Sequence, residues 1–173
     1  MRETSTGLTW RVQALSEIPK AEDEKRPYFA YGSNLCLDRI NRRCPENRRI
    51  GTAVLSGYRV VCNKKGKDGK NFYAGLVESQ QDEVLGALYH LSAKNIDTLD
   101  GIEIGYYRNY DKFYVKNRET GEQTDCFTYW VTKPMPPQKP GAKYWERILK
   151  GCRDHEFPEE YLKNLLRWFQ MAK

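Results

Sequence analysis

Residues 27–34 carry the sequence Pro27-Tyr28-Phe29-Ala30-Tyr31-Gly32-Ser33-Asn34. The apolar and aromatic run at its start has the composition of a short buried strand, and the Gly-Ser-Asn that follows it is typical of a turn. A helix is expected next, because Leu37, Ile40 and Cys44 are spaced three and four residues apart. A strand that runs into a glycine-containing turn and then a helix is therefore the first unit of the fold.

Beyond this unit the sequence predicts mostly β structure, followed by helices. A proline-rich stretch at 134–140 predicts a stiff connector, because proline removes a backbone donor and fixes φ. The other expected elements are strands at about 50–63 (interrupted by Gly57), 72–78 and 84–91, a helix capped by Ser92, a hairpin of 107–116 with 123–132, and closing helices at about 143–154 and from 158 onward.

This order of elements favours the α+β class. Several strands with peripheral helices predict a small mixed β-barrel or curled sheet flanked by helices. We expect residues 27–173 to form this single domain. Residues 1–26, which end in a run of charged side chains, are expected to be an N-terminal extension.

The amino-acid composition excludes several classes of protein for this chain. The 173 residues include 29 Lys and Arg against 23 Asp and Glu, and their 39% hydrophobic content is enough for a core, which excludes wholesale disorder. No apolar run reaches the roughly 20 residues of a membrane-spanning helix. The five cysteines are scattered and form no Cys-x-x-Cys pair, which argues against a disulfide framework. With no signal-peptide pattern near the N-terminus, a cytoplasmic location is expected.

The turn at Gly32, Ser33 and Asn34 is the first candidate site. Glycine allows close backbone approach, and the first N–H groups of a helix lack intrahelical acceptors, so a carboxylate or an oxyanion would be bound well there. The alternative is a structural role, in which Gly32 makes a tight turn and Ser33 or Asn34 caps the helix. The pattern alone leaves both interpretations open.

Glu103 is the second candidate, as a general acid or base. Ile96, Leu99 and Glu103 follow the i, i+3, i+7 spacing of one helical face, so a continuous helix would direct the carboxylate toward the core. The alternative is that the helix ends at Gly101 and leaves Glu103 in an exposed loop.

Other kinds of site have weaker support. His90 and His155 are far apart and have no Cys or carboxylate at ligand spacing, so no metal site is expected. Serine-nucleophile elbows and the Walker and Rossmann glycine patterns are absent from the sequence. Basic residues within 39–49 and 64–70 have no interleaved aromatics, which favours solvated surface over a nucleic-acid site.

Taken in order, these segments resemble the γ-glutamylcyclotransferase family over about residues 27–165. Tyr28–Asn34 is similar to the YGSN-type turn of that family, and Leu99–Glu103 is similar to its catalytic-glutamate segment. Gln81–Gly86 and Lys143–Cys152 also match the family's later strand and closing helix. One departure is Ile104, where the family commonly has glycine, and a β-branched residue restricts the backbone there.

The resemblance implies an enzyme without metal or cofactor that cyclises a γ-glutamyl amino acid or peptide. The products would be 5-oxoproline and a free amino acid, with Glu103 as catalytic acid and base. The substrate-binding residues that the resemblance implies are Tyr28, Phe29, Ala30, Tyr31, Gly32, Ser33, Asn34, Tyr110 and Tyr144.

Several alternatives remain open at this point. A γ-glutamylamine, glutathione, or a γ-glutamyl protecting group in a biosynthetic pathway would present the same glutamyl end to the site. A catalytically inactive binding module of the same fold is a different class, for which Ile104 is the only hint. No nucleic-acid or membrane partner is expected, and a homodimer is suggested by the family alone.

Overall fold

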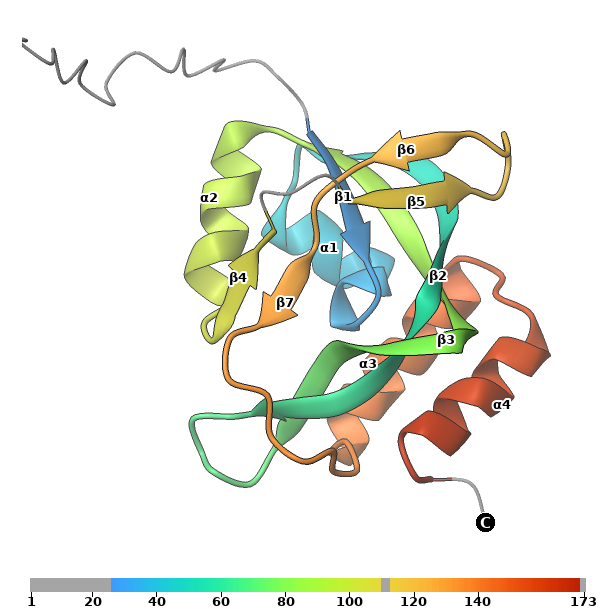
Figure 1. Ribbon diagram of the computed structural model, residues 1–173. Coiled ribbons are helices and arrows are strands. Elements are labelled where there is room, and N and C mark those ends of the chain that lie inside the picture. Colours follow the sequence, from blue (N-terminus) through green and yellow to red (C-terminus); the bar gives the residue numbers. More distant parts are fainter. Residues whose placement is uncertain (1–25, 110–112, 172–173) are drawn as a thin grey trace, which may run out of the picture.

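Figure 1 shows a computed structural model of the chain, which describes residues 26–109 and 113–171. The expected N-terminal extension therefore lies almost entirely outside the described residues. The helices of the described part are the short 3-10 helix η1 (Ser33–Leu35), α1 (Leu37–Arg43), α2 (Ala93–Ile102), α3 (Ala142–Asp154) and α4 (Glu159–Trp168). Its strands are β1 (Arg26–Ala30), β2 (Arg48–Lys65), β3 (Phe72–Leu91), β4 (Tyr106–Arg108), β5 (Tyr114–Asn117), β6 (Gln123–Asp125) and β7 (Tyr129–Val131).

The main sheet is antiparallel and strongly curled. Its strand order is β1-β3-β2-β5-β6, with the long strands β2 and β3 at the centre. The register between β2 and β3 shifts at three places, and such bulges bend and twist a strand, so the pair curves around the molecule (Figure 1). Within the described residues β1 and β6 remain edge strands, so the sheet curls without closing into a barrel. The α+β class with a curled sheet flanked by helices is confirmed.

Two strands are longer than the sequence pattern predicted. The strands expected at 72–78 and 84–91 are one strand, β3, because the polar residues between them form a solvent-exposed stretch of strand and not a loop. Gly57 does not interrupt β2 either. It adopts a φ of +83° at the register shift between Ser56 and Tyr58, a conformation that glycine takes without strain and that lets the strand continue past a bulge.

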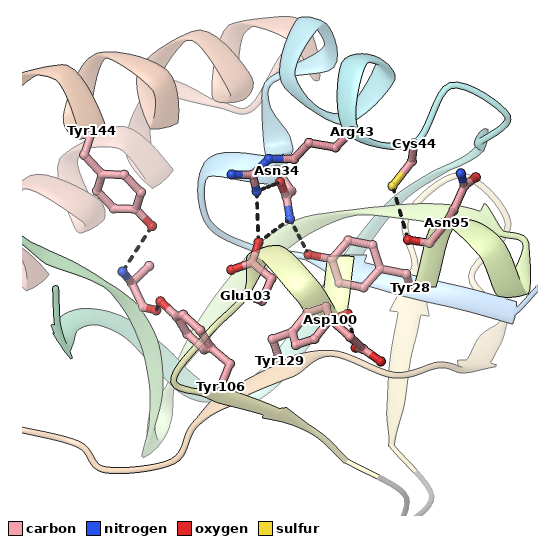
Figure 2. A network of polar contacts seen from close by, with 11 residues as sticks. Tyr28, Asn34, Arg43, Cys44, Asn95, Asp100, Glu103, Tyr106, Tyr129 and Tyr144 are labelled. Carbon is pink, nitrogen blue, oxygen red and sulfur yellow. Dashed lines mark hydrogen bonds and ion pairs between the residues drawn. The ribbon is translucent and has the colours of Figure 1, made fainter. Parts of the chain in front are cut away.

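The hairpin expected from 107–116 and 123–132 is divided between two sheets. Strands β5 and β6 pair in the main sheet, whereas β4 and β7 form a separate two-stranded sheet. Residues 110–112, between β4 and β5, lie outside the described residues. The division brings Tyr106 and Tyr129, at the start of β4 and of β7, to the side of the molecule that carries Glu103 (Figure 2).

Helices α3 and α4 cover the opposite side of the molecule from α2 (Figure 1). Their apolar faces are buried, with Ile148 and Leu165 fully enclosed. Helix α3 packs closely on η1, where Gly151 faces the backbone of Leu35 and Cys36. None of the described helices is long and apolar enough to cross a membrane.

His155, at the end of α3, is buried behind η1. Its Nδ1 accepts a hydrogen bond from Arg49 Nε at 3.2 Å, so the ring proton is on Nε2, which donates to the Leu35 carbonyl oxygen at 2.9 Å. Burial, and next the charge of Arg49, lower the pKa of His155. The histidine is therefore a structural residue that fixes η1, which contains Ser33 and Asn34 of the candidate turn.

This histidine predicts a loss of stability in mild acid. The unfolded chain binds a proton on His155 more readily than the folded chain. The contribution of the buried neutral imidazole to the free energy of unfolding is therefore complete above about pH 6.5, and it is lost as the pH falls toward the lowered pKa of the folded state. Its contribution should fall by up to about 1.4 kcal/mol per pH unit. Urea unfolding of wild type and His155→Gln at pH 7.5 and 5.5 should show a smaller difference between the two proteins at pH 5.5. An equal difference at both pH values would contradict the prediction.

Candidate active site

Glu103 is held at the centre of a polar network. Helix α2 continues through Gly101 to Ile102, so Glu103 follows its last residue, and its side chain is only 18% exposed. Its Oε1 accepts hydrogen bonds from Arg43 Nη1 at 3.0 Å and from Asn34 Nδ2 at 3.1 Å (Figure 2). The exposed-loop alternative for Glu103 is therefore wrong, and the carboxylate is fixed against the turn.

Asn34 links the turn to the glutamate. The residue is only 4% exposed. Its Nδ2 donates to Tyr28 Oη at 3.0 Å, and its Oδ1 accepts from Arg43 Nη1 at 2.8 Å. Neither η1 nor α1 has a side-chain hydrogen bond at its N-cap. The helix-capping alternative for Ser33 and Asn34 is therefore wrong.

Both the glutamate and the turn have polar atoms without a hydrogen-bond partner among the described residues. Within the described residues, the second oxygen of Glu103, Oε2, has no hydrogen-bond partner. The backbone N–H groups of Gly32, Ser33 and Asn34 likewise have no acceptor in the described part of the chain. The site therefore offers one carboxylate oxygen as a proton acceptor and several N–H donors for an oxygen of a bound molecule.

These groups surround a narrow cavity of about 30 Å³. The lining residues are Tyr28, Tyr31, Gly32, Ser33, Asn34, Ala74, Glu103, Tyr106, Tyr129 and Tyr144. A Cβ atom on Gly32 would lie 3.2 Å from Tyr144 Oη and 3.3 Å from Ala74 Cβ, so a side chain there would crowd the wall. The site residues predicted from the sequence thus line this one cavity, with three exceptions. Phe29 and Ala30 are fully buried in the core beside the cavity, and Tyr110 lies outside the described residues.

Buried tyrosines form much of the cavity wall. Tyr144 Oη accepts from the Ala74 backbone N–H at 3.1 Å, and Tyr106 Oη donates to the Ala74 carbonyl at 2.7 Å. Burial raises the pKa of both phenols, so their hydroxyl groups stay neutral. Neither Tyr106 nor Tyr129 was predicted from the sequence, although Tyr106 lies only three residues after Glu103.

Arg43 was also missed, because its helical position suggested a solvated polar face. Its side chain is only 16% exposed and is ion-paired with Glu103. Arg39 is partly buried, whereas Arg42 and Arg48 are exposed as expected. The solvated-surface interpretation is therefore wrong for Arg43 and incomplete for Arg39.

Thiol chemistry has little support near the site. Burial raises the pKa of Cys44 to about 11 and that of Cys62 to about 12, so neither is a thiolate near neutral pH. In the described part of the chain, no group of three His, Cys, Asp or Glu side chains is placed to hold a metal ion.

The departure at Ile104 has a structural account. Ile104 is 53% exposed and is not part of the core. The left-handed backbone conformation falls one residue later, at Gly105, with a φ of +88°. The turn after Glu103 therefore obtains its glycine at the second position.

Comparison with known proteins identifies the family. A model of the AIG2-like family matches residues 83–165. A γ-glutamylcyclotransferase from Mus musculus is 31% identical over 151 residues, 83% of this chain and 79% of the mouse protein, and one from Bos taurus is 28% identical over 86% of this chain and 81% of its own. A solved γ-glutamyl cyclotransferase structure superposes with a TM-score of 0.72 at 27% identity, over 82% of this chain and 86% of that chain. The chain belongs to the γ-glutamylcyclotransferase family.

Proposed function

We propose that this protein converts γ-glutamyl amino acids or peptides to 5-oxoproline and a free amine, with Glu103 as the acid and base. The observation that carries the proposal is the free Oε2 of Glu103 on the same narrow cavity as the unpaired N–H groups of the turn. Family membership supports the reaction class.

The reaction needs proton transfer but no enzyme nucleophile. Glu103 removes a proton from the substrate α-ammonium group, and the freed nitrogen attacks the γ-carbonyl carbon. A new C–N bond closes the five-membered ring and the original amide C–N bond breaks. The protons lost by the attacking nitrogen pass through Glu103 to the leaving nitrogen, so the reaction consumes no water.

The other residues hold the substrate in a reactive conformation. Intramolecular attack gains from orientation, with effective molarities of the order of 10⁵–10⁸ M in the best cases. The N–H groups of Gly32, Ser33 and Asn34 are suited to the substrate carboxylate or to the oxyanion of the tetrahedral intermediate. Arg43 and Asn34 hold Oε1, which leaves Oε2 to exchange protons.

A substrate panel tests the proposal. We expect purified protein to release 5-oxoproline from γ-glutamyl-alanine and related dipeptides, and not from the α-linked isomers, whose geometry does not allow five-membered ring closure on the same carbonyl. 5-Oxoproline is measured by chromatography and the released amine by derivatisation. Binding of γ-glutamyl compounds without release of either product would identify an inactive binding module instead.

A further inference from the structure

A second, wider cavity adjoins Glu103 and has a basic wall. Its volume is about 470 Å³, and it shares Ser33, Glu103, Tyr106 and Tyr144 with the narrow cavity. The basic residues of its wall come from separate parts of the chain and are Arg39, Arg43, Lys64, Lys67 and Arg147. The two basic clusters that the sequence places far apart therefore meet beside the candidate catalytic group.

Most of this positive charge has no protein counter-charge. In the described residues only Arg43 of the five is ion-paired, with Glu103. The remaining acidic group of the wall is Asp68, whose Oδ1 already accepts from the backbone N–H groups of Lys70 and Asn71 at 2.9 Å. Four cations thus face one carboxylate that is occupied by its own loop.

Two of these cations are partly removed from water. The Nε atom of Arg39 is buried and has no hydrogen-bond partner, and burial, followed by the like charges of Arg43 and Arg147, lowers the pKa of Arg39. Lys64 Nζ lies 5.2 Å and 5.6 Å from the ring centres of Tyr73 and Tyr106. Partly buried positive charge without a counter-charge is unfavourable, so a bound anion would be favoured here.

We infer that the leaving group of the substrate carries two or more anionic groups and occupies this basic cavity. The inference rests on the proposed function, because it places the γ-glutamyl end in the narrow cavity and the leaving amine in the wide one. A leaving amino acid has one carboxylate of its own. The surplus of cations matches a second anion on its side chain, either a carboxylate or a phosphate monoester, and disfavours a cationic leaving group.

Two matched substrate pairs test the inference. γ-Glutamyl-glutamate and γ-glutamyl-glutamine have nearly the same size and differ by one charge. γ-Glutamyl-O-phosphoserine and γ-glutamyl-serine differ by a phosphate group, which adds about two negative charges. We expect kcat/KM to favour the anionic member of at least one pair by about tenfold or more at low salt, and the preference to shrink as salt is added. The pair with the larger preference distinguishes a carboxylate from a phosphate leaving group.

A variant of the wall and a matched control complete the test. Arg147→Gln should reduce the anionic preference several-fold, whereas Arg153→Gln, an equal charge change on an exposed residue of the same helix outside the cavity, should leave it unchanged. Equal kcat/KM within both pairs, with γ-glutamyl-alanine turned over, would overturn this inference alone. No 5-oxoproline from any compound would overturn it together with the proposed function.

Discussion

Glu103→Gln should abolish most 5-oxoproline release while leaving the fold intact. Glutamine keeps an oxygen that can accept from Arg43 and Asn34, so the network around the turn is preserved. An amide cannot take and return a proton, and loss of a general acid–base typically costs about 10²–10⁴-fold in rate. We expect kcat to fall within that range, measured as initial rates of 5-oxoproline formation under saturating γ-glutamyl dipeptide.

The control for this variant is Asp97→Asn. Asp97 is an exposed acid on the same helix, so its neutralisation removes the same charge at a distance from the cavity and should leave kcat unchanged. Thermal unfolding of both variants should match wild type closely. Near-normal turnover by a folded Glu103→Gln protein would remove Glu103 from the acid–base role and require a different proton carrier.

The sequence predicted the parts of the site that depend on local pattern. The apolar run before Gly32 predicted a buried strand and turn, and the spacing of Ile96, Leu99 and Glu103 predicted the inward direction of the carboxylate. Ser92 caps α2 as expected, through a hydrogen bond from the Asn95 N–H at 3.2 Å. Each of these signals arises within about ten residues of chain, where helix and strand periodicity fix which way a side chain points.

The missed features depend on contacts between distant segments. Arg43 pairs with Glu103 across 60 positions of sequence, and no local pattern distinguishes such an arginine from a solvated one. The same limit applies to the basic cavity, which is lined by Lys64 from β2 and by Arg147 from α3. The exposed middle of β3 was missed because a polar stretch of strand has the composition of a loop.

Gly151→Ala should destabilise the protein and weaken substrate turnover together. A Cβ atom at position 151 would lie 2.4 Å from Leu35 Cβ and 2.7 Å from the Cys36 backbone nitrogen, distances that side chains cannot tolerate. Because backbone atoms of η1 are among the neighbours, α3 and η1 must separate. We expect the free energy of unfolding to fall by about 2 kcal/mol, measured by urea denaturation.

Gly101→Ala is the matched control, since it makes the same change inside another helix. A Cβ atom at Gly101 would meet nothing within 4 Å, so alanine should be neutral or stabilise α2 by up to about 1 kcal/mol through its higher helix propensity. A loss of stability in Gly151→Ala without a loss in Gly101→Ala would separate the effect of packing against η1 from the effect of helix propensity. Displacement of η1 also moves Ser33 and Asn34, which belong to it, and the adjoining Gly32. The kcat/KM of Gly151→Ala should therefore fall even at temperatures where the protein is fully folded. Normal stability and normal kcat/KM in Gly151→Ala would show that α3 does not fix the position of the turn.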